Sequence, residues 1–216
     1  MTGATLRRRD DGSIELRVNG VFVMDDVETS SEEALAHTVL GLGAREILVG
    51  GLGLGFTLRA LLGSSDVRRV VVAELHPEIV GWMRAGEIPG ADLLADVRTE
   101  VVADDVRRVV RAQPISSLDA IVLDVDNGPD FLVHDTNAAV YRPGFVETCA
   151  TRLRAGGHLC VWSMDDSAAL RAAMARQLSD VRGTSLPVTL QGRAEHYWIL
   201  TGRRDTGGGA AARSAL

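Results

Sequence analysis

Short apolar runs alternate with segments of helical periodicity along most of the chain. The apolar runs, each suited to a buried strand, lie at 47–50, 69–74, 99–103, 119–124 and 157–163. The helical segments follow them in turn, at 56–62, 77–85, 105–112, 143–153 and 167–178. This alternation predicts an α/β domain in which helices cover both faces of a mostly parallel sheet.

The start of the chain has a different pattern, because apolar and polar residues alternate over 14–24. Asn19 and Gly20 lie in the middle of this stretch and form a strong two-residue turn signal, so we expect a β-hairpin there. The basic cluster at 7–9 is followed at once by acidic residues, which indicates a solvated beginning of the chain. Ser30 then offers a cap for a helix with glutamates in its first turn.

The end of the α/β pattern also differs from its middle. Segments 185–190 and 196–202 read as strands joined by a short turn around Gly192, which predicts an antiparallel hairpin at one edge of the sheet. The stretch after them is rich in glycine and alanine and lacks helix caps, so we expect it to be disordered. The predicted units are a hairpin segment at 1–27, the α/β domain at 28–204 and a disordered tail at 205–216.

Composition and charge narrow the function classes. The hydrophobic fraction of 46% and the charged fraction of 24% are typical of a globular protein, and the net charge of −6 argues against nucleic-acid binding. Cys149 and Cys160 are expected to be reduced core residues, and no Cys/His spacing indicates a zinc site. No apolar run has the ~18–20 residues of a membrane span, and no secretory signal is recognisable. We therefore expect a cytoplasmic enzyme with no metal and no membrane association.

The first parallel strand runs directly into glycines at alternate positions, Gly51, Gly53 and Gly55. A strand that turns on glycines into a helix brings backbone N–H groups close to a nucleotide or nucleoside. The later third glycine of the dinucleotide motif is missing, so the spacing fits an adenosyl-binding turn better. A tight strand–helix connection that binds no ligand is the alternative at this point.

Acidic residues follow the next three strands. Glu74, Asp104 and Asp124 each stand where a predicted strand ends. Open parallel sheets bind ligands at the carboxyl ends of their strands, and a carboxylate about 20 residues after the glycine turn binds ribose hydroxyls in related folds. The alternative is that the acids cap the helices that follow, which suits Asp105 best.

Here the chain resembles the spermidine synthase-like (polyamine aminopropyltransferase) family, which has the class I S-adenosylmethionine-dependent methyltransferase fold. The matching segments are 28–37, Val49 to Arg59, Glu74, Asp104, the Asp124 to Pro129 motif that contains Asp126, and 154–157. The resemblance implies a Rossmann-like seven-stranded sheet that is mostly parallel, with an antiparallel C-terminal hairpin and a short N-terminal β-hairpin.

The resemblance also implies roles for these residues. The donor would be S-adenosylmethionine or its decarboxylated form, bound by the glycine turn, Glu74, Asp104 and Asp124. Asp124 would also be the general base that takes a proton from an amine, and the Asp126 region would hold the cationic amine. The physical chemistry agrees, because carboxylates attract an ammonium ion and then accept the proton it must lose before it attacks a sulfonium carbon.

Two further residues are candidates for contact with the substrate. His37 matches a position that the family keeps in the helix before the first parallel strand, although a histidine on a helix surface is an equal alternative. Tyr141 follows the loop after the Asp motif, where it would close over a bound substrate.

The chain departs from the family where the donor and acceptor are distinguished. Leu54 replaces an aspartate that binds the amine of the decarboxylated donor, and Ser31 replaces a substrate-binding tyrosine. Without that aspartate, nothing at this position repels a donor that keeps its carboxylate, so methyl transfer to an amine is the main expectation. Aminopropyl transfer that makes spermidine or a related polyamine is the alternative.

Other classes remain open as well. A non-catalytic nucleoside-binding protein would explain the altered substrate half of the site. A nicotinamide-dependent dehydrogenase shares the fold class, but the glycine spacing and the terminal hairpin disfavour it. The partner is expected to be a small amine, and the 14–24 hairpin offers an edge through which a homodimer could form.

Overall fold

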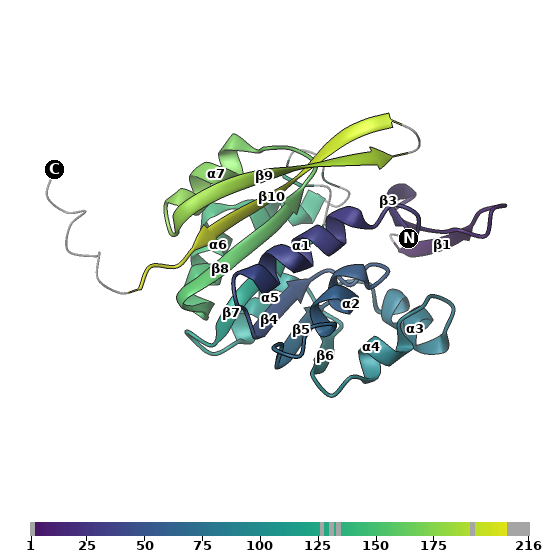
Figure 1. Ribbon diagram of the computed structural model, residues 1–216, viewed down its shortest axis with the longest axis horizontal. Coiled ribbons are helices and arrows are strands. Elements are labelled where there is room, and N and C mark those ends of the chain that lie inside the picture. The colour runs from purple at the N-terminus through teal and green to yellow at the C-terminus, as the bar shows by residue number, and fades with distance from the viewer. Residues whose placement is uncertain (1–2, 126–127, 130–131, 133–134, 191–192, 207–216) are drawn as a thin grey trace, which may run out of the picture.

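The computed structural model describes residues 3–125, 128–129, 132, 135–190 and 193–206. Its centre is a seven-stranded sheet with the order β6-β5-β4-β7-β8-β10-β9 (Figure 1). The strands are β4 (Glu46–Gly50), β5 (Arg69–Ala73), β6 (Thr99–Val102), β7 (Leu118–Leu123), β8 (Leu153–Ser163), β9 (Ser179–Leu190) and β10 (Arg193–Arg203). Strands β4 to β8 are parallel, and β10 runs antiparallel to both β8 and β9. The predicted mostly parallel sheet with an antiparallel C-terminal hairpin is confirmed.

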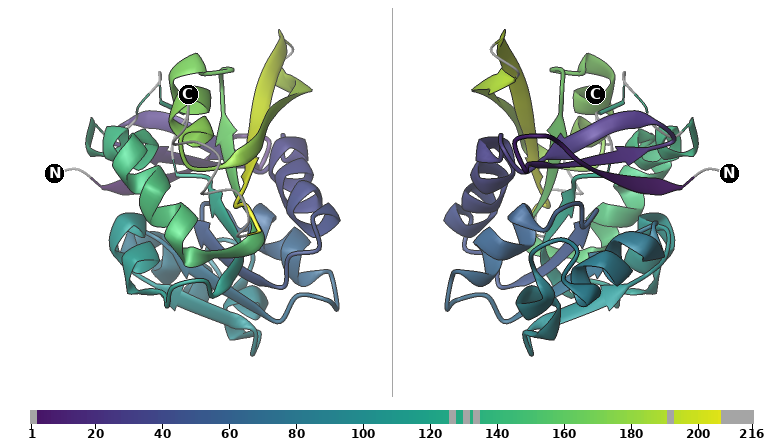
Figure 2. Two further views of the ribbon diagram at one scale, coloured as in Figure 1. Left: turned by 90° about the vertical axis from the view of Figure 1, so that its left-hand side faces the viewer. Right: turned by 90° about the vertical axis from the view of Figure 1, so that its right-hand side faces the viewer.

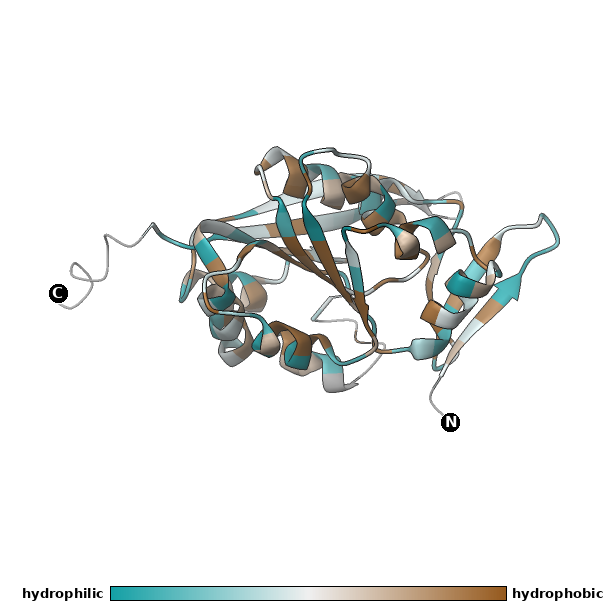
Figure 3. Ribbon diagram, turned by 90° about the horizontal axis from the view of Figure 1, so that it is seen from below, coloured by the Kyte–Doolittle hydropathy of each residue, from teal (hydrophilic) through white to brown (hydrophobic). Residues whose placement is uncertain are grey.

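Helices cover both faces of this sheet. They are α1 (Ser30–Gly41), α2 (Phe56–Leu62), α3 (Pro77–Ala85), α4 (Ala91–Ala95), α5 (Val106–Ala112), η1 (Asp135–Tyr141), α6 (Pro143–Arg152) and α7 (Ala168–Ala175). Successive residues of β4 point to opposite faces, so Ile47 packs with α1 to α4 while Leu48 packs with α5 to α7. Figure 2 shows these two helical layers from both sides, and Figure 3 shows the apolar strands between them.

A smaller antiparallel sheet precedes the α/β domain and consists of β1 (Ala4–Arg8), β2 (Ile14–Val18) and β3 (Val21–Asp25). The predicted hairpin is present as β2 and β3, and its turn residues Asn19 and Gly20 have φ of 54° and 79°. The prediction of a solvated beginning of the chain holds for Arg7 and Arg8, which are exposed, but not for Arg9. Residues 4–8 form β1, and Arg9 after it pairs with the buried carboxylates of Glu15 and Asp25 at 2.7 and 2.8 Å.

Some boundaries differ from the sequence pattern. The helices at 56–62 and 77–85 lie where they were predicted, whereas β8 and β9 begin several residues earlier and the helix predicted at 167–178 ends at Ala175. The short helix α4 and the 3₁₀ helix η1 were not predicted, because segments of this length have little periodicity. The tail from residue 207 lies outside the described residues. None of the described helices has the length and apolarity needed to cross a bilayer.

Candidate active site

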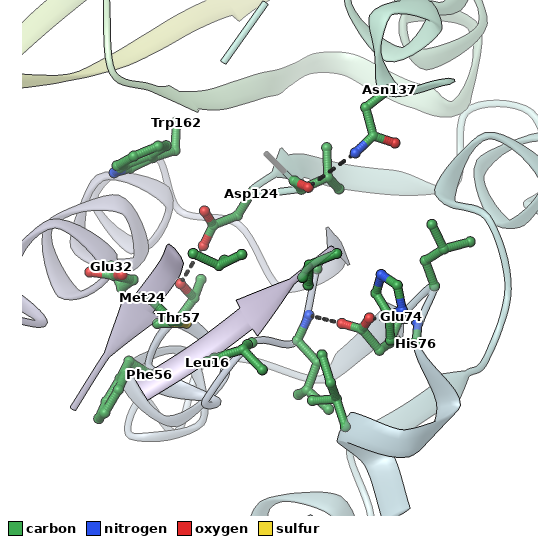
Figure 4. Close-up of a pocket in the computed structure, with 18 of the residues that line it drawn as sticks. Leu16, Met24, Glu32, Phe56, Thr57, Glu74, His76, Asp124, Asn137 and Trp162 are labelled. Atoms are coloured by element: carbon green, nitrogen blue, oxygen red, sulfur yellow. Dashed lines mark hydrogen bonds between the residues drawn. The ribbon is translucent and has the colours of Figure 1, made fainter. Parts of the chain in front are cut away.

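A cavity of about 230 Å³ lies at the carboxyl ends of the parallel strands (Figure 4). Its wall combines the glycine turn and the ends of β5, β7 and β8 with side chains of α1 and of the N-terminal sheet. The sheet contributes Leu16 from β2 and Met24 from β3. Ligands bind in this place in open α/β sheets, so we take the cavity as the candidate active site. The contribution of the N-terminal hairpin to this wall was not predicted from the sequence, although the alternation of its apolar residues showed that one face would be buried.

The glycine turn forms one wall of the cavity. Gly51 and Gly53 line it, with φ of 95° and 52°, a region that favours glycine. A Cβ on Gly51 would lie 2.0 Å from the carbonyl oxygen of Asp124, so only glycine lets β4 and β7 approach this closely. Gly55 has φ of 87° and faces Met83 of α3 instead, so its role is packing at the start of α2.

Glu74 lies at the end of β5, is 4% exposed and lines the cavity. Its Oε2 accepts a 2.8 Å hydrogen bond from the backbone N–H of Leu52, and its Oε1 accepts one of 2.8 Å from that of His76. Burial raises the pKa of Glu74, and the backbone hydrogen bonds oppose that rise. The carboxylate therefore fixes the glycine turn, and each of its oxygens keeps a lone pair that a hydroxyl group can use.

Asp124 follows β7 and also lines the cavity, between the glycine turn and Trp162. Its Oδ2 accepts a hydrogen bond of 3.1 Å from the hydroxyl of Thr57, in the first turn of α2. Burial and the negative charge of Glu32 raise the pKa of Asp124 to about 7, and the Thr57 hydroxyl opposes this rise. A carboxyl group with this pKa exchanges a proton readily at neutral pH, which suits a general base.

The structure separates Asp104 from the cavity wall. The Asp104 carboxylate turns to the backbone N–H of Asp105 and to the guanidinium of Arg108, which lowers its pKa. Asp105 lines the cavity instead and caps α5 through a 2.8 Å hydrogen bond from the backbone N–H of Arg107. The placement predicted for Asp104 therefore belongs to its neighbour, because the helix cap decides which carboxylate points inward.

The remaining predicted residues lie elsewhere. His37 is exposed, because α1 buries the face that carries Leu35 and Val39. Tyr141 is 6% exposed and belongs to the core beneath α5 to α7, so it is not in the cavity wall. Asp126 lies outside the described residues.

Leu54 does not face the cavity. It is 4% exposed and packs in the core beneath α1 to α4, and its backbone N–H points to the sulfur of Met24 at 3.3 Å. The replacement of an acid at this position therefore says little about which donor the cavity accepts.

The acidic character of the cavity wall was not predicted from the sequence. The lining residues include Asp25, Glu28 and Glu32 besides the acids at the strand ends, and one histidine, His76. No arginine or lysine is among the lining residues that the structure describes. Glu28 and Glu32 stand four residues apart, on the approach to α1 and in its first turn. Only the packing of α1 against the sheet brings the charge of Glu32 close to Asp124. The cavity suits a cationic ligand. No cluster of three or more metal-ligating side chains occurs in the described part of the chain.

Comparison with known proteins finds two kinds of relatives. The chain is 34% identical over 180 residues to polyamine aminopropyltransferase 2 of Pseudomonas aeruginosa, with 74% of this chain and 49% of the relative covered. It is 29% identical over 154 residues to putrescine N-methyltransferase 3 of Nicotiana tabacum, with 69% of this chain and 37% of the relative covered. The chain thus spans about half the length, or less, of the curated relatives it matches. No family model matches the chain.

Solved structures give the same fold. A spermidine synthase in complex with the transition-state analogue AdoDATO aligns with a TM-score of 0.79 at 17% identity, covering 93% of this chain and 70% of that one. The spermidine synthase of Thermotoga maritima aligns with a TM-score of 0.76 at 17% identity, covering 93% and 68%. The likeness establishes the class I methyltransferase fold that the sequence implied.

Proposed function

Because the chain is a spermidine synthase-like protein with the class I methyltransferase fold, we propose that it transfers the aminopropyl group of decarboxylated S-adenosylmethionine to an amine. This choice departs from methyl transfer, which was the main expectation from the sequence. The aminopropyltransferase relative is both more identical to the chain and aligned over more of it than the N-methyltransferase relative.

The observation that carries the proposal is the charge of the cavity wall. S-adenosylmethionine carries a carboxylate, and an anion taken out of water needs a cationic or hydrogen-bonding partner. The described wall has six carboxylates and no arginine or lysine to pair with it. The decarboxylated donor has no carboxylate and keeps two positive charges, one on sulfur and one on its amine. The wall therefore stabilises the decarboxylated donor and repels the negative end of the other.

The nucleoside half of the donor fits the side of the cavity that the glycine turn forms. Gly51 and Gly53 expose backbone there, and the fixed Glu74 carboxylate has lone pairs left for the ribose hydroxyls. These residues would bind and orient the donor next to Asp124.

The transfer step then needs one base. The acceptor nitrogen, once neutral, forms a bond to the carbon next to sulfur, and the bond between that carbon and sulfur breaks. The electron pair of the broken bond stays on sulfur, which leaves a neutral thioether nucleoside. The nitrogen loses one proton to Asp124, whose pKa of about 7 allows it to accept that proton and release it to water.

Methyl transfer to an amine is the second candidate, and the similarity to a putrescine N-methyltransferase favours it. Both reactions use the same base and the same nucleoside contacts. They differ in the donor, so a competition between donors separates them.

The test is a donor screen with the purified chain. S-Adenosylmethionine and its decarboxylated form would each be incubated with a panel of linear amines, and the products identified by mass spectrometry. We expect aminopropylated amines from the decarboxylated donor, and loss of product in the Asp124→Asn variant. Methylated products would favour the second candidate. Binding of a donor without any transfer would favour a non-catalytic nucleoside-binding protein.

A further inference from the structure

Two carboxylates face each other in the N-terminal sheet. Glu15 of β2 and Asp25 at the end of β3 are cross-strand partners, and each is 4% exposed. Like charges in this arrangement are destabilising, and a buried charge needs a partner. Arg9 is the partner of both: its Nε and Nη2 contact Glu15 at 2.8 and 2.7 Å, and its Nη1 donates to Asp25 at 2.8 Å. One guanidinium therefore joins the segment after β1 to the two other strands of the sheet.

The two oxygens of Asp25 have different partners. Its Oδ2 accepts from Arg9, whereas its Oδ1 accepts hydrogen bonds of 3.0 and 3.2 Å from the backbone N–H groups of Val27 and Glu28. These two N–H groups belong to the segment that leads from β3 to α1. A side chain buried in the N-terminal sheet thus fixes the path of the chain into the helix.

The beginning of α1 and the approach to it carry acids of the cavity wall. Glu28 and Glu32 line the cavity together with Asp25, and the charge of Glu32 contributes to the raised pKa of Asp124. Arg9 is not among the described lining residues, nor among the described charges that shift the pKa of Asp124. Any influence of Arg9 on the site therefore passes through Asp25.

A second arginine joins the same cluster without reaching Asp25. Arg17 pairs with Oε1 of Glu15 and donates to the carbonyl oxygen of Gly20 at 2.9 Å. Among the described residues it has no ion pair with Asp25. Arg9 and Arg17 therefore share Glu15, but only Arg9 contacts the carboxylate that fixes the approach to α1.

We propose that Arg9 is a positioning residue for the transfer reaction, which acts through Asp25 to hold Glu28 and Glu32 at the cavity. The guanidinium holds the Asp25 carboxylate in place, and Asp25 holds the approach to α1 through the N–H groups of Val27 and Glu28. The N-terminal sheet thus controls the charge around the proposed base in addition to covering the cavity. This inference rests on the proposed transfer to an amine.

The test compares two double variants that have the same net charge. Arg9→Gln combined with Glu15→Gln removes the partner of Asp25 together with the opposing carboxylate. Arg17→Gln combined with Glu15→Gln also removes one arginine and one glutamate, but it leaves the contact between Arg9 and Asp25. None of the three substituted residues is in the described wall of the cavity. A difference between the variants therefore reports the hold on Asp25 and not the loss of an ion pair at Glu15.

The first measurement is the pH profile of kcat/KM with the decarboxylated donor and 1,4-diaminobutane. We expect the acid limb of the Arg9→Gln/Glu15→Gln variant to move to lower pH by about one unit, because a displaced Glu32 repels the charge of Asp124 less. The limb of the Arg17→Gln/Glu15→Gln variant should coincide with that of the wild type. The proposal is wrong if the limb of the Arg9 variant stays in place or moves to higher pH, or if both variants move it equally.

A single variant replaces the Arg9 double variant if the latter does not fold. Arg9→Lys keeps the positive charge but lacks the planar fork that contacts both carboxylates, and Arg17→Lys is its control. We expect the acid limb to move to lower pH in Arg9→Lys alone, by less than in the double variant. Profiles of Arg9→Lys and Arg17→Lys that both match the wild type would overturn the proposal.

Hydrogen exchange separates a failure of this inference from a failure of the proposed function, because it needs no substrate. Asp25 accepts from the N–H groups of Val27 and Glu28, so we expect these groups to exchange about tenfold faster or more in the Arg9 variant, and at the wild-type rate in the Arg17 variant. Faster exchange in a protein that alkylates no amine would support the hold of Arg9 on Asp25 and refute the transfer. Unchanged exchange in the Arg9 variant would overturn the inference even where transfer is observed.

Discussion

The backbone N–H of Leu52 donates a 2.8 Å hydrogen bond to the carboxylate of Glu74, and this bond joins the glycine turn to the end of β5. The other carboxylate oxygen accepts from the backbone N–H of His76, at the cap of α3. One buried side chain therefore fixes two backbone segments at the place where the nucleoside is proposed to bind.

Glu74→Gln tests this double role. A glutamine has a single side-chain oxygen, so one backbone N–H would face an amide NH₂ group and lose its acceptor. We expect the free energy of unfolding to fall by about 1–3 kcal/mol and the donor affinity to fall with it. Urea denaturation and calorimetry with the donor measure the two effects. Glu87→Gln, at an exposed position, should change neither, and an unchanged donor affinity in Glu74→Gln would contradict the assignment.

The pH dependence of transfer should follow Asp124. Its pKa is about 7, so the carboxylate that accepts the proton is lost as the pH falls below that value. We expect kcat/KM to drop tenfold per pH unit on the acid side of the profile. We expect the rate of the Asp124→Asn variant at pH 8 to be lower than that of the wild type by a factor of about 10²–10⁴. Donor binding in that variant should persist. A rate independent of pH between 5 and 8 would argue against this base.

The same pKa has a consequence for stability. The folded-state pKa of Asp124, about 7, lies above the ordinary aspartate value of 3.8, so protonation favours the folded state between these values. This stabilisation of the folded state by the protonated Asp124 is fully present below about pH 4 and is lost as the pH rises through 7. We therefore expect Asp124→Asn to be more stable than the wild type at pH 8, by on the order of 4 kcal/mol at most, and the gain to shrink at pH 5. Thermal unfolding at both pH values measures it, and an equal difference at both would contradict the raised pKa.

The sequence predicted the framework of this site but not all of its members. Glu74 and Asp124 were found because apolar runs locate strand ends, and parallel strands end at the same edge of the sheet. Asp104 was chosen instead of Asp105, because a difference of one residue is decided by helix capping. The effect of the negative charge of Glu32 on the pKa of Asp124 was not predicted, since it depends on how α1 packs against strands more than 80 residues later in the chain.

The N-terminal sheet is a second case in which the pattern of apolar and polar residues does not predict the structure. The strand β1 has arginines at successive positions, which hide the alternation that would mark it as a strand. It is recognisable only once its pairing with β2 and the ion pairs of Arg9 with Glu15 and Asp25 are seen. The predicted hairpin thus became a three-stranded sheet that covers the cavity.

A substitution at Thr57 should change the pKa of Asp124 while Asp124 itself stays in place. Its hydroxyl donates to the Asp124 carboxylate at 3.1 Å and lowers the pKa of that group. Thr57→Val keeps the shape but removes this donor, so we expect the acid limb of the pH profile to move to higher pH. Thr57→Ser retains a hydroxyl and should leave the limb in place. Identical profiles for Thr57→Val and Thr57→Ser would mean that the hydrogen bond does not control Asp124.

Gly51 and Gly86 allow the close approach of β4 and β7 to be separated from backbone strain. Both have positive φ, 95° and 78°, so an alanine at either position is strained, by about 1–2 kcal/mol. A Cβ at residue 86 would meet nothing within 4 Å, whereas one at residue 51 would lie 2.0 Å from the carbonyl oxygen of Asp124. We therefore expect Gly86→Ala to lose about 1–2 kcal/mol of unfolding free energy and to keep its activity. Gly51→Ala should lose more than that, and transfer should fall as well, because the displaced backbone carries the base. Equal losses of stability in the two variants would show that conformation alone, and not the contact with Asp124, requires glycine at residue 51.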